Sequence, residues 1–148
     1  MKDLAMLLHE AAGLMRRRFE QAARPFGLTL MQWRALGLLG KNGPMRQVAI
    51  GEALEASPMT ISDLAERLSS AGLVTRRPDP TDSRAKQLDL TEEGRQMIAR
   101  MATRADEIFA ESFSGITGPE RDAMMSALEK MKTNLGAATA APADGQQA

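Results

Sequence analysis

The stretch GLVTRRPDPTDSRAKQLDLTEEG, residues 72–94, differs from the rest of the chain, where apolar residues recur mostly with helical spacing. Two short runs in it, 73–76 and 87–90, alternate like strands, and the loop between them is dense in Pro, Asp and Arg. This pattern predicts a β-hairpin. The basic residues in and around it are Arg76, Arg77, Arg84 and Lys86. Pro78 and Pro80 keep the tip narrow, and an arginine on a narrow tip can enter the minor groove of DNA.

The acidic residues of this hairpin leave two interpretations open. Asp79, Asp82 and Asp89 nearly balance the basic residues, so charge alone favours a solvated hairpin without a ligand. Asp82 is unfavourable as a DNA contact. Its carboxylate has a physical role if it holds either the Arg84 guanidinium or a neighbouring backbone N–H in one orientation.

Two helices precede the hairpin immediately. A short one is predicted within 46–56, and the next is capped by Ser57, has Pro58 at its first position and ends at Gly72. The residues expected to face the core are Ile61, Leu64, Ala65 and Leu68. Two short helices and a hairpin in series predict a winged helix-turn-helix, whose second helix places its first turn in the major groove. The candidate DNA contacts on this helix are Ser57, Met59, Thr60, Ser62 and Arg67, the last as a phosphate contact.

Helices are also predicted at both ends of the chain. Apolar residues recur with helical spacing from Asp3 to about Arg24, and a second helix begins at Thr29, which has capping-box spacing with Gln32. After the hairpin, Thr91 caps a long helix, and residues 117–120 form a second capping box. Leu4, Leu7 and Leu8 are apolar at the start of the chain and indicate a partner helix from this chain or a second subunit. The last helix has apolar residues at Leu128, Met131 and Leu135.

Composition excludes several kinds of chemistry. The 148 residues contain no cysteine and a single histidine, His9, so thiolate sites are excluded and a multi-histidine metal site is not expected. No nucleophile with a base and no glycine-rich phosphate loop can be named, so we predict neither an enzyme nor a cofactor. No signal peptide or membrane span is expected, which predicts a cytoplasmic protein. The formal net charge of zero counts mildly against binding to nucleic acid.

The spacing within the hairpin decides between these interpretations. Asp82-x-Arg84, followed by Leu88-x-Leu90-Thr91-x-x-Gly94, resembles the wing of the MarR/SlyA family of bacterial transcription regulators. The resemblance extends upstream to LTLMQWRALGLL, residues 28–39, and includes further single positions. These are Gln47, Leu54, Ser57, Thr60, Arg67, Leu68 and the segment 71–74.

This resemblance implies a fold that is mainly α with a small β-hairpin wing. Its expected parts are an N-terminal dimerisation helix (1–27), a winged helix-turn-helix lobe (28–95), a long helix with a C-terminal dimerisation helix (96–136) and a disordered tail (137–148). It implies a homodimer whose first and last helices interlock through apolar residues, which are Leu4, Leu7, Leu8, Leu128, Met131 and Leu135. It also implies Arg84 in the minor groove, Asp82 as its support and the helix from Ser57 in the major groove. The operator is then pseudo-palindromic, with half-sites about 34–36 Å apart.

The chain departs from the family pattern at two places. Ser83 stands where the wing often has arginine, and the recognition helix lacks the arginine that many members carry near Pro58 or Asp63, so that Arg67 is its single arginine. Both departures remove positive charge, so we expect moderate affinity for DNA and a shallow dependence on salt.

Family resemblance also implies a small aromatic or phenolic effector, bound between the dimerisation helices and the DNA-binding lobe. The candidate contacts are His9, Met31, Trp33, Arg34 and Met101. Trp33 and the methionines are equally understandable as core residues, and His9 as a surface or interface residue. The predicted function is a transcriptional regulator, with repression favoured because a dimer on a promoter blocks polymerase. The alternative is a winged-helix protein-interaction module that does not bind DNA.

Overall fold

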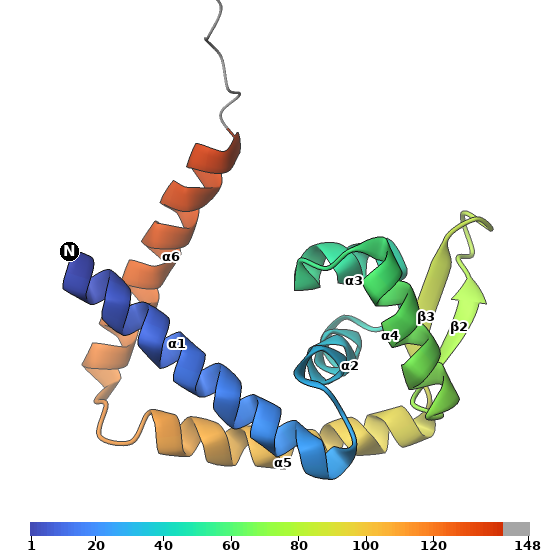
Figure 1. Cartoon of the computed structure of the whole chain (residues 1–148), viewed down its shortest axis with the longest axis horizontal. Coiled ribbons are helices and arrows are strands. Elements are labelled where there is room, and N and C mark those ends of the chain that lie inside the picture. The colour runs from blue at the N-terminus through green and yellow to red at the C-terminus, as the bar shows by residue number, and fades with distance from the viewer. Residues whose placement is uncertain (141–148) are drawn as a thin grey trace, which may run out of the picture. The chain divides into compact units, whose positions relative to one another are not determined.

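The computed structural model describes residues 1–140, with side chains up to residue 137. Its elements are α1 (Lys2–Ala23), η1 (Arg24–Phe26), α2 (Leu30–Asn42), β1 (Met45–Arg46), α3 (Gln47–Leu54), α4 (Pro58–Ser70), β2 (Val74–Pro78), β3 (Lys86–Leu90), α5 (Glu92–Ser112) and α6 (Gly118–Ala140) (Figure 1). The chain forms two compact units, which divide after Ser112. The predicted fold class, mainly α with a β-hairpin wing, is confirmed.

Helix α4 begins and ends where its local signals predict. The Ser57 hydroxyl accepts a hydrogen bond from the Thr60 N–H at 3.2 Å, which satisfies one free donor of the first turn. At the other end, Gly72 has φ +74° and donates to the Ser69 carbonyl, while the Leu73 N–H donates to the Leu68 carbonyl. This pair of bonds is a Schellman motif, which needs a left-handed residue and therefore favours glycine.

Helix α2 begins with the predicted capping box. The Thr29 hydroxyl accepts from the Gln32 N–H at 3.2 Å, and the Gln32 side chain accepts from the Thr29 N–H at 2.9 Å. The reciprocal bonds fix the direction in which the chain enters the helix. The buried face of α2, which includes Leu36 and Leu39, then packs in the core.

The sheet contains one strand more than the sequence predicted. Its order is β1-β3-β2, and both pairings are antiparallel. The hairpin strands pair Val74 with Leu90 and Arg76 with Leu88. Leu88, in the central strand, is fully buried in the core. Strand β1 pairs Arg46 with Gln87 and has only two residues, too few to show an alternating pattern.

The base of the wing is joined closely to the start of α5. The Thr91 hydroxyl donates to the Gly72 carbonyl at 2.6 Å and accepts from the Gly94 N–H at 3.0 Å, so it caps α5 as predicted. The Thr91 N–H donates to the Leu73 carbonyl at 3.1 Å. A Cβ on Gly94 would lie 2.1 Å from that carbonyl oxygen, so only glycine fits at this approach. The wing therefore has a fixed base between α4 and α5.

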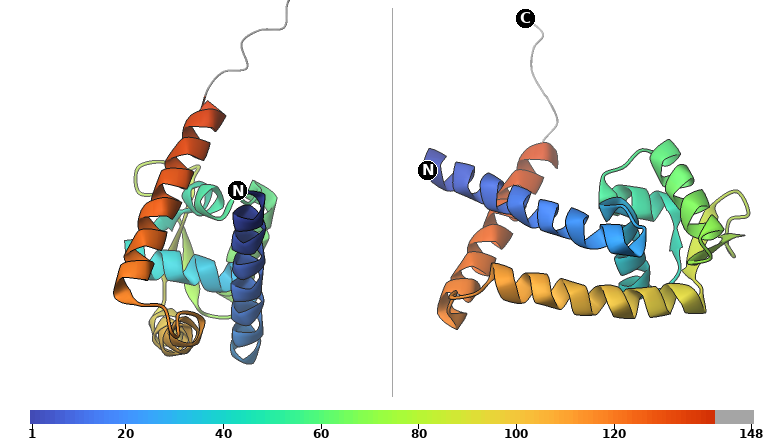
Figure 2. Two further views of the ribbon diagram at one scale, coloured as in Figure 1. Left: turned by 90° about the vertical axis from the view of Figure 1, so that its left-hand side faces the viewer. Right: turned by 60° about the horizontal axis from the view of Figure 1, so that its bottom comes forward.

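The core of the first unit joins helices α2 to α5 to the sheet. Its largest fully buried side chains are Leu36, Leu39, Ile50, Ile61, Leu68, Leu88 and Ile108. The four residues of α4 that were predicted to face the core are all buried. Helix α1 packs on this lobe, along α5 (Figure 2). Its Phe19 ring contacts two other rings, with centroid distances of 6.0 Å to Trp33 and 5.4 Å to Phe109.

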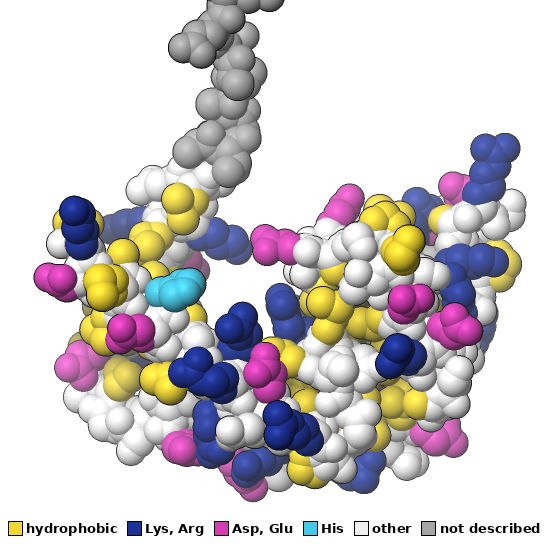
Figure 3. All heavy atoms as spheres, in the orientation of Figure 1, with side chains coloured by type: hydrophobic (Ala, Val, Ile, Leu, Met, Phe, Trp, Pro, Cys, Tyr) yellow, Lys and Arg dark blue, Asp and Glu magenta, His cyan; other side chains and the backbone are white. Residues whose placement is uncertain are grey.

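Large apolar side chains remain exposed on both terminal helices. Leu4, Leu7 and Leu8 lie exposed on α1, and Leu7 is 63% exposed. On α6 the exposed residues include Leu128, Met131 and Leu135. The surface of the described chain shows such side chains at the N-terminal end of α1 and on α6 (Figure 3). All six residues predicted to form a dimer are thus on the surface of the single chain.

Helix α6 forms the second unit. Both the hydroxyl and the N–H of Thr117 donate to the Glu120 carboxylate, at 2.7 and 2.8 Å, and these bonds lower the pKa of Glu120. The helix continues to Ala140, although the sequence predicted that the ordered chain would end at Gly136. Of the tail predicted to be disordered, residues 141–148 lie outside the described residues.

Candidate nucleic-acid interface

Helix α4 lies beside the wing, so the predicted recognition residues and the hairpin arginines belong to one region of the lobe (Figure 1). Met59 is 76% exposed and lies in the first turn of α4. Ser57 and Thr60 are also exposed, but their hydroxyls lie 2.9 Å apart and hydrogen-bond each other. Arg67 is exposed two turns further on, beside Asp63 and Glu66.

Arg76 is held by two helices. Its Nε donates to Oε1 of Gln47 at 2.7 Å, and its Nη2 donates to the Ser62 hydroxyl at 3.2 Å. Two residues predicted as DNA contacts, Arg76 and Ser62, therefore hydrogen-bond each other. The contact joins strand β2 to the start of α3 and to the middle of α4.

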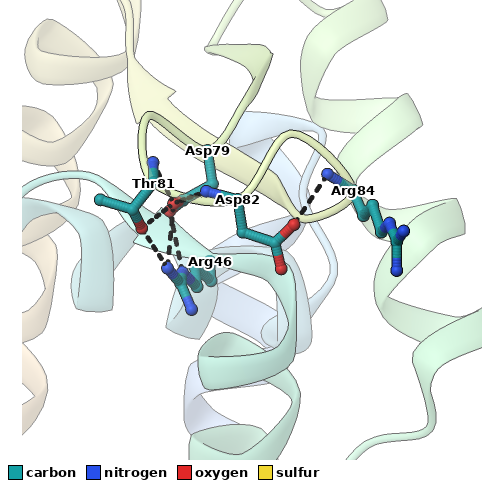
Figure 4. A network of polar contacts seen from close by, with 5 residues as sticks. All are labelled: Arg46, Asp79, Thr81, Asp82 and Arg84. Atoms are coloured by element: carbon teal, nitrogen blue, oxygen red, sulfur yellow. Dashed lines mark hydrogen bonds and ion pairs between the residues drawn. The ribbon is translucent and has the colours of Figure 1, made fainter.

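The remaining basic residues of the wing point to solvent. Arg77, Arg84 and Lys86 are exposed, and Arg84 lies in the loop that joins β2 to β3. The Asp82 carboxylate accepts the backbone N–H of Arg84 at 3.0 Å. Of the two roles left open for Asp82, the structure thus shows the one in which its carboxylate orients the backbone. The Arg84 side chain extends away from that carboxylate (Figure 4).

The wing tip is anchored by an ion pair that the sequence interpretation did not identify. Arg46 donates through Nε and Nη2 to the two carboxylate oxygens of Asp79, at 2.8 and 2.9 Å (Figure 4). Asp79 is only 7% exposed, and its Oδ1 also accepts the N–H groups of Thr81 and Asp82, at 2.9 and 3.1 Å. The Thr81 hydroxyl donates to the same oxygen and accepts from Arg46 at 2.7 Å.

These contacts fix the charge of the Asp79 carboxylate. The hydrogen bond from Arg46 and those from Thr81 hold the pKa of Asp79 well below its ordinary value. The same hydrogen bond and the charge of Asp79 raise the pKa of Arg46. The pair is therefore ionised throughout the physiological range. The short turn at Asp79 and Thr81 is an Asx-turn, for which Asp-Pro-Thr gave a local signal, but nothing near Arg46 marked it as the partner.

A groove joins the two predicted DNA-contacting elements. It has a volume of about 600 Å³ and lies between α3, the start of α4 and the wing. Its lining includes Val48 and Glu52 from α3, Pro58 from α4, and Arg84 and Lys86 from the wing. The basic residues at the wing thus face the N-terminal end of the recognition helix, where the positive end of the helix dipole favours an anion such as phosphate.

The residues predicted to contact an effector are divided between the core and the surface. Trp33 and Met101 are buried, and Met31 is partly buried against the core. Arg34 is exposed on α2. His9 is exposed and lines a hollow of about 410 Å³ whose lining residues all belong to α1. Within residues 1–140, no helix has the length and apolar character to cross a membrane.

Comparison with known proteins identifies the family. A model of the MarR family matches residues 26–85. The HTH-type transcriptional repressor IacR of Pseudomonas putida is 32% identical over 123 residues, which are 83% of this chain and 74% of that protein. The chain belongs to the MarR family.

Solved structures of MarR-type regulators have the same fold. The structure of BpsR from Bordetella bronchiseptica, a protein whose DNA binding is regulated by 6-hydroxynicotinic acid, matches with a TM-score of 0.76 and 28% identity. The match covers 88% of this chain and 98% of that chain. CouR from Rhodococcus jostii RHA1, bound to p-coumaroyl-CoA, matches with a TM-score of 0.77 and 28% identity, over 87% and 91% of the two chains.

The MarR family model matches most of the region that carries the candidate DNA contacts. The matched residues 26–85 begin in η1, include all of α4 and end in the wing just after Arg84. They also contain both members of the Arg46–Asp79 pair. The helix-turn-helix and the anchored tip of the wing thus lie within the matched segment, whereas strand β3 follows it.

Proposed function

We propose that this MarR-family protein is a sequence-specific DNA-binding repressor that acts as a homodimer on a pseudo-palindromic operator. The first turn of α4 enters the major groove, and Arg84 enters the adjacent minor groove. The observation that carries the proposal is the groove that Arg84 and Lys86 line together with the start of α4. A duplex that fills this face meets both elements at once.

The distribution of charge supports this proposal despite a formal net charge of zero. Arg77, Arg84 and Lys86 are exposed on the wing, whereas the buried Asp79 charge is already neutralised by Arg46. The wing therefore presents more positive charge to a ligand than its composition indicates. Arg67 adds a phosphate contact on α4, but the neighbouring Asp63 and Glu66 weaken it, so a moderate affinity is expected.

Exposed apolar residues on the terminal helices support the homodimer. Leu4, Leu7 and Leu8 on α1 and Leu128 and Met131 on α6 are exposed in the single chain. Burying one such side chain contributes about 1.5–3 kcal/mol, and a dimer interface that covers all of them offsets part of the entropy lost on association. A two-fold dimer presents two copies of α4 and the wing to a symmetric operator.

Known relatives support release of the repressor by a small aromatic or phenolic ligand. BpsR is regulated by 6-hydroxynicotinic acid, and the CouR structure contains p-coumaroyl-CoA. In this chain the ligand contacts are proposed from His9, Met31, Trp33, Arg34 and Met101. A regulator of this kind works in the cytoplasm of a bacterium, on the nucleoid.

The proposal is tested by fluorescence anisotropy with a random-sequence DNA duplex over a series of salt concentrations. Wild-type protein is compared with Arg84→Glu and with Arg24→Glu, which makes the same charge change at an exposed site in η1. We expect wild type and Arg24→Glu to bind with an affinity that falls with salt, and Arg84→Glu to lose binding while it remains dimeric.

Two results contradict the proposal. Equal losses of DNA affinity in Arg84→Glu and Arg24→Glu would mean that net charge, not the wing, controls binding. A dimeric wild type that binds no duplex at low salt would favour the protein-interaction module instead. If binding is seen, selection of an operator from a random library is the next step.

A further inference from the structure

We propose that Arg46 is a positioning residue for DNA binding, which together with Gln47 fixes the wing relative to the recognition helix before DNA arrives. The inference rests on the proposed function, because it concerns how the wing of a DNA-binding protein is placed. Arg46 lies in the two-residue strand β1, directly before α3, and Gln47 is the first residue of that helix. These two neighbours hold different parts of the hairpin.

Arg46 holds the tip of the wing. It makes a bidentate contact with Asp79 at 2.8 and 2.9 Å, and a third bond to the Thr81 hydroxyl at 2.7 Å. Asp79 and Asp82 extend the hydrogen bonding along the loop. The Asp79 carboxylate accepts the Asp82 N–H, and the Asp82 carboxylate accepts the N–H of Arg84. A continuous path of hydrogen bonds therefore connects Arg46 to the backbone of the arginine proposed to enter the minor groove (Figure 4).

Gln47 holds the stem of the wing. Its side chain accepts from Arg76 of β2 at 2.7 Å, and Arg76 also donates to Ser62 of α4 at 3.2 Å. The start of α3 is thus connected to the recognition helix through β2, and to the wing tip through Asp79. With both contacts made, the tip and α4 are held as one body. Binding of a ligand then avoids the entropy cost of ordering the loop.

A competing interpretation is that Arg46 contacts DNA phosphate directly. Its side chain is about half exposed in the ion pair, and Lys86 and Arg84 line the same groove. The two roles differ in their dependence on salt. Loss of a phosphate contact lowers the slope of log K against log salt by about 0.9, whereas loss of positioning weakens binding at all salt concentrations with the same slope.

The sharpest test uses Asp79→Asn beside Asp89→Asn. Each variant removes one negative charge from the hairpin, so a count of charges predicts that both bind DNA more tightly. In Asp79→Asn the side-chain amide keeps an oxygen for the Thr81 and Asp82 N–H groups but cannot form the ion pair with Arg46. Positioning therefore predicts that Asp79→Asn binds a duplex about tenfold more weakly than Asp89→Asn.

Variants of Arg46 complete the DNA-binding test. Arg46→Met should weaken DNA binding about tenfold, with an unchanged slope of log K against log salt. The affinity of Arg46→Lys should lie between those of Arg46→Met and wild type, because an ammonium group cannot form the bidentate contact. A slope that falls by about one in Arg46→Met would overturn the proposal in favour of a phosphate contact. Asp79→Asn that binds as tightly as Asp89→Asn would also overturn it.

A second measurement keeps the inference separate from the proposed function. Amide hydrogen exchange in the free protein reports whether the wing is ordered, through the Asp79 N–H, which donates to the Ala85 carbonyl at 2.9 Å, and the Ala85 N–H. We expect faster exchange at both amides in Asp79→Asn and Arg46→Met, and unchanged exchange in Asp89→Asn. If the wild type binds no DNA, the proposed function fails, but the hydrogen-exchange rates still show whether Arg46 and Asp79 hold the wing in place. Unchanged exchange in all variants would refute it.

Discussion

Helix α4 and the wing tip lie side by side but are held by different kinds of contact. The ends of α4 are fixed by bonds between near neighbours, such as Ser57 with Thr60 and Leu68 with Leu73. The wing tip is fixed by Arg46 and Asp79, which are 33 positions apart. A helix that carries its own boundary signals can be recognised from a short stretch of chain, whereas a loop anchored from a distance cannot.

The largest effect on the free energy of unfolding is expected at Gly94, where the base of the wing meets the start of α5. In Gly94→Ala the added Cβ would lie 2.1 Å from the Leu73 carbonyl oxygen, so the wing base and α5 must move apart. We expect the free energy of unfolding to fall by about 2–3 kcal/mol, as in other overpacked sites. Urea denaturation followed by circular dichroism measures this change.

The matched control for that change is Gly37→Ala in α2. Nothing lies within 4 Å of a Cβ at Gly37, so alanine adds helix propensity without a clash. It should raise the free energy of unfolding by about 0.5–1 kcal/mol. A loss of stability in both variants would mean that the close approach at Gly94 is not the cause.

Removing the cap should affect α4 and leave the wing tip in place. Ser57→Ala deprives the Thr60 N–H of its 3.2 Å acceptor, which should cost about 1 kcal/mol of stability. Ser69→Ala, at an exposed position near the end of the same helix, is the control, because only the Ser69 carbonyl takes part in the C-terminal motif. Hydrogen exchange at Asp79 should stay unchanged in both variants; faster exchange there would show that the wing depends on the cap.

The same difference between local and distant contacts separates the features that the sequence predicted from those that it did not. The caps at Ser57 and Thr29, the stop at Gly72 and the hairpin were all predicted, since each depends on residues a few positions apart. Strand β1 and the partner of Asp79 were not, because a two-residue strand has no period and a distant partner leaves no spacing to detect. For Asp82 the residues left two roles open, and only the structure distinguished the backbone contact from a bond to the guanidinium.

A smaller effect is expected in the stem of the wing. The Thr75 hydroxyl oxygen in β2 is buried and has no hydrogen-bond partner within the described residues. Thr75→Val replaces it with a methyl group of similar size, which should raise the free energy of unfolding by about 0.5–1 kcal/mol. Thermal unfolding measures the gain, and DNA binding should not change. A loss of stability would mean that the hydroxyl has a partner, such as an ordered water.

A pH-dependent effect is expected from Asp79, whose carboxylate stabilises the wing tip at the edge of the lobe. Its pKa is lowered from an ordinary value of 3.8, so the ionised form stabilises the folded state above that pH. The contribution is lost as pH falls below about 4 and through the folded-state pKa. The charged groups that face this carboxylate are Arg46 and Asp82, and the pKa of Arg46 is raised by its contact with Asp79, so Arg46 stays cationic over this range. The difference in unfolding free energy between wild type and Asp79→Asn should therefore be constant from about pH 5 to 7 and shrink in acid. A difference that grows in acid would mean that the carboxylate is bound in its neutral form, and the ion pair could not then be what orders the wing.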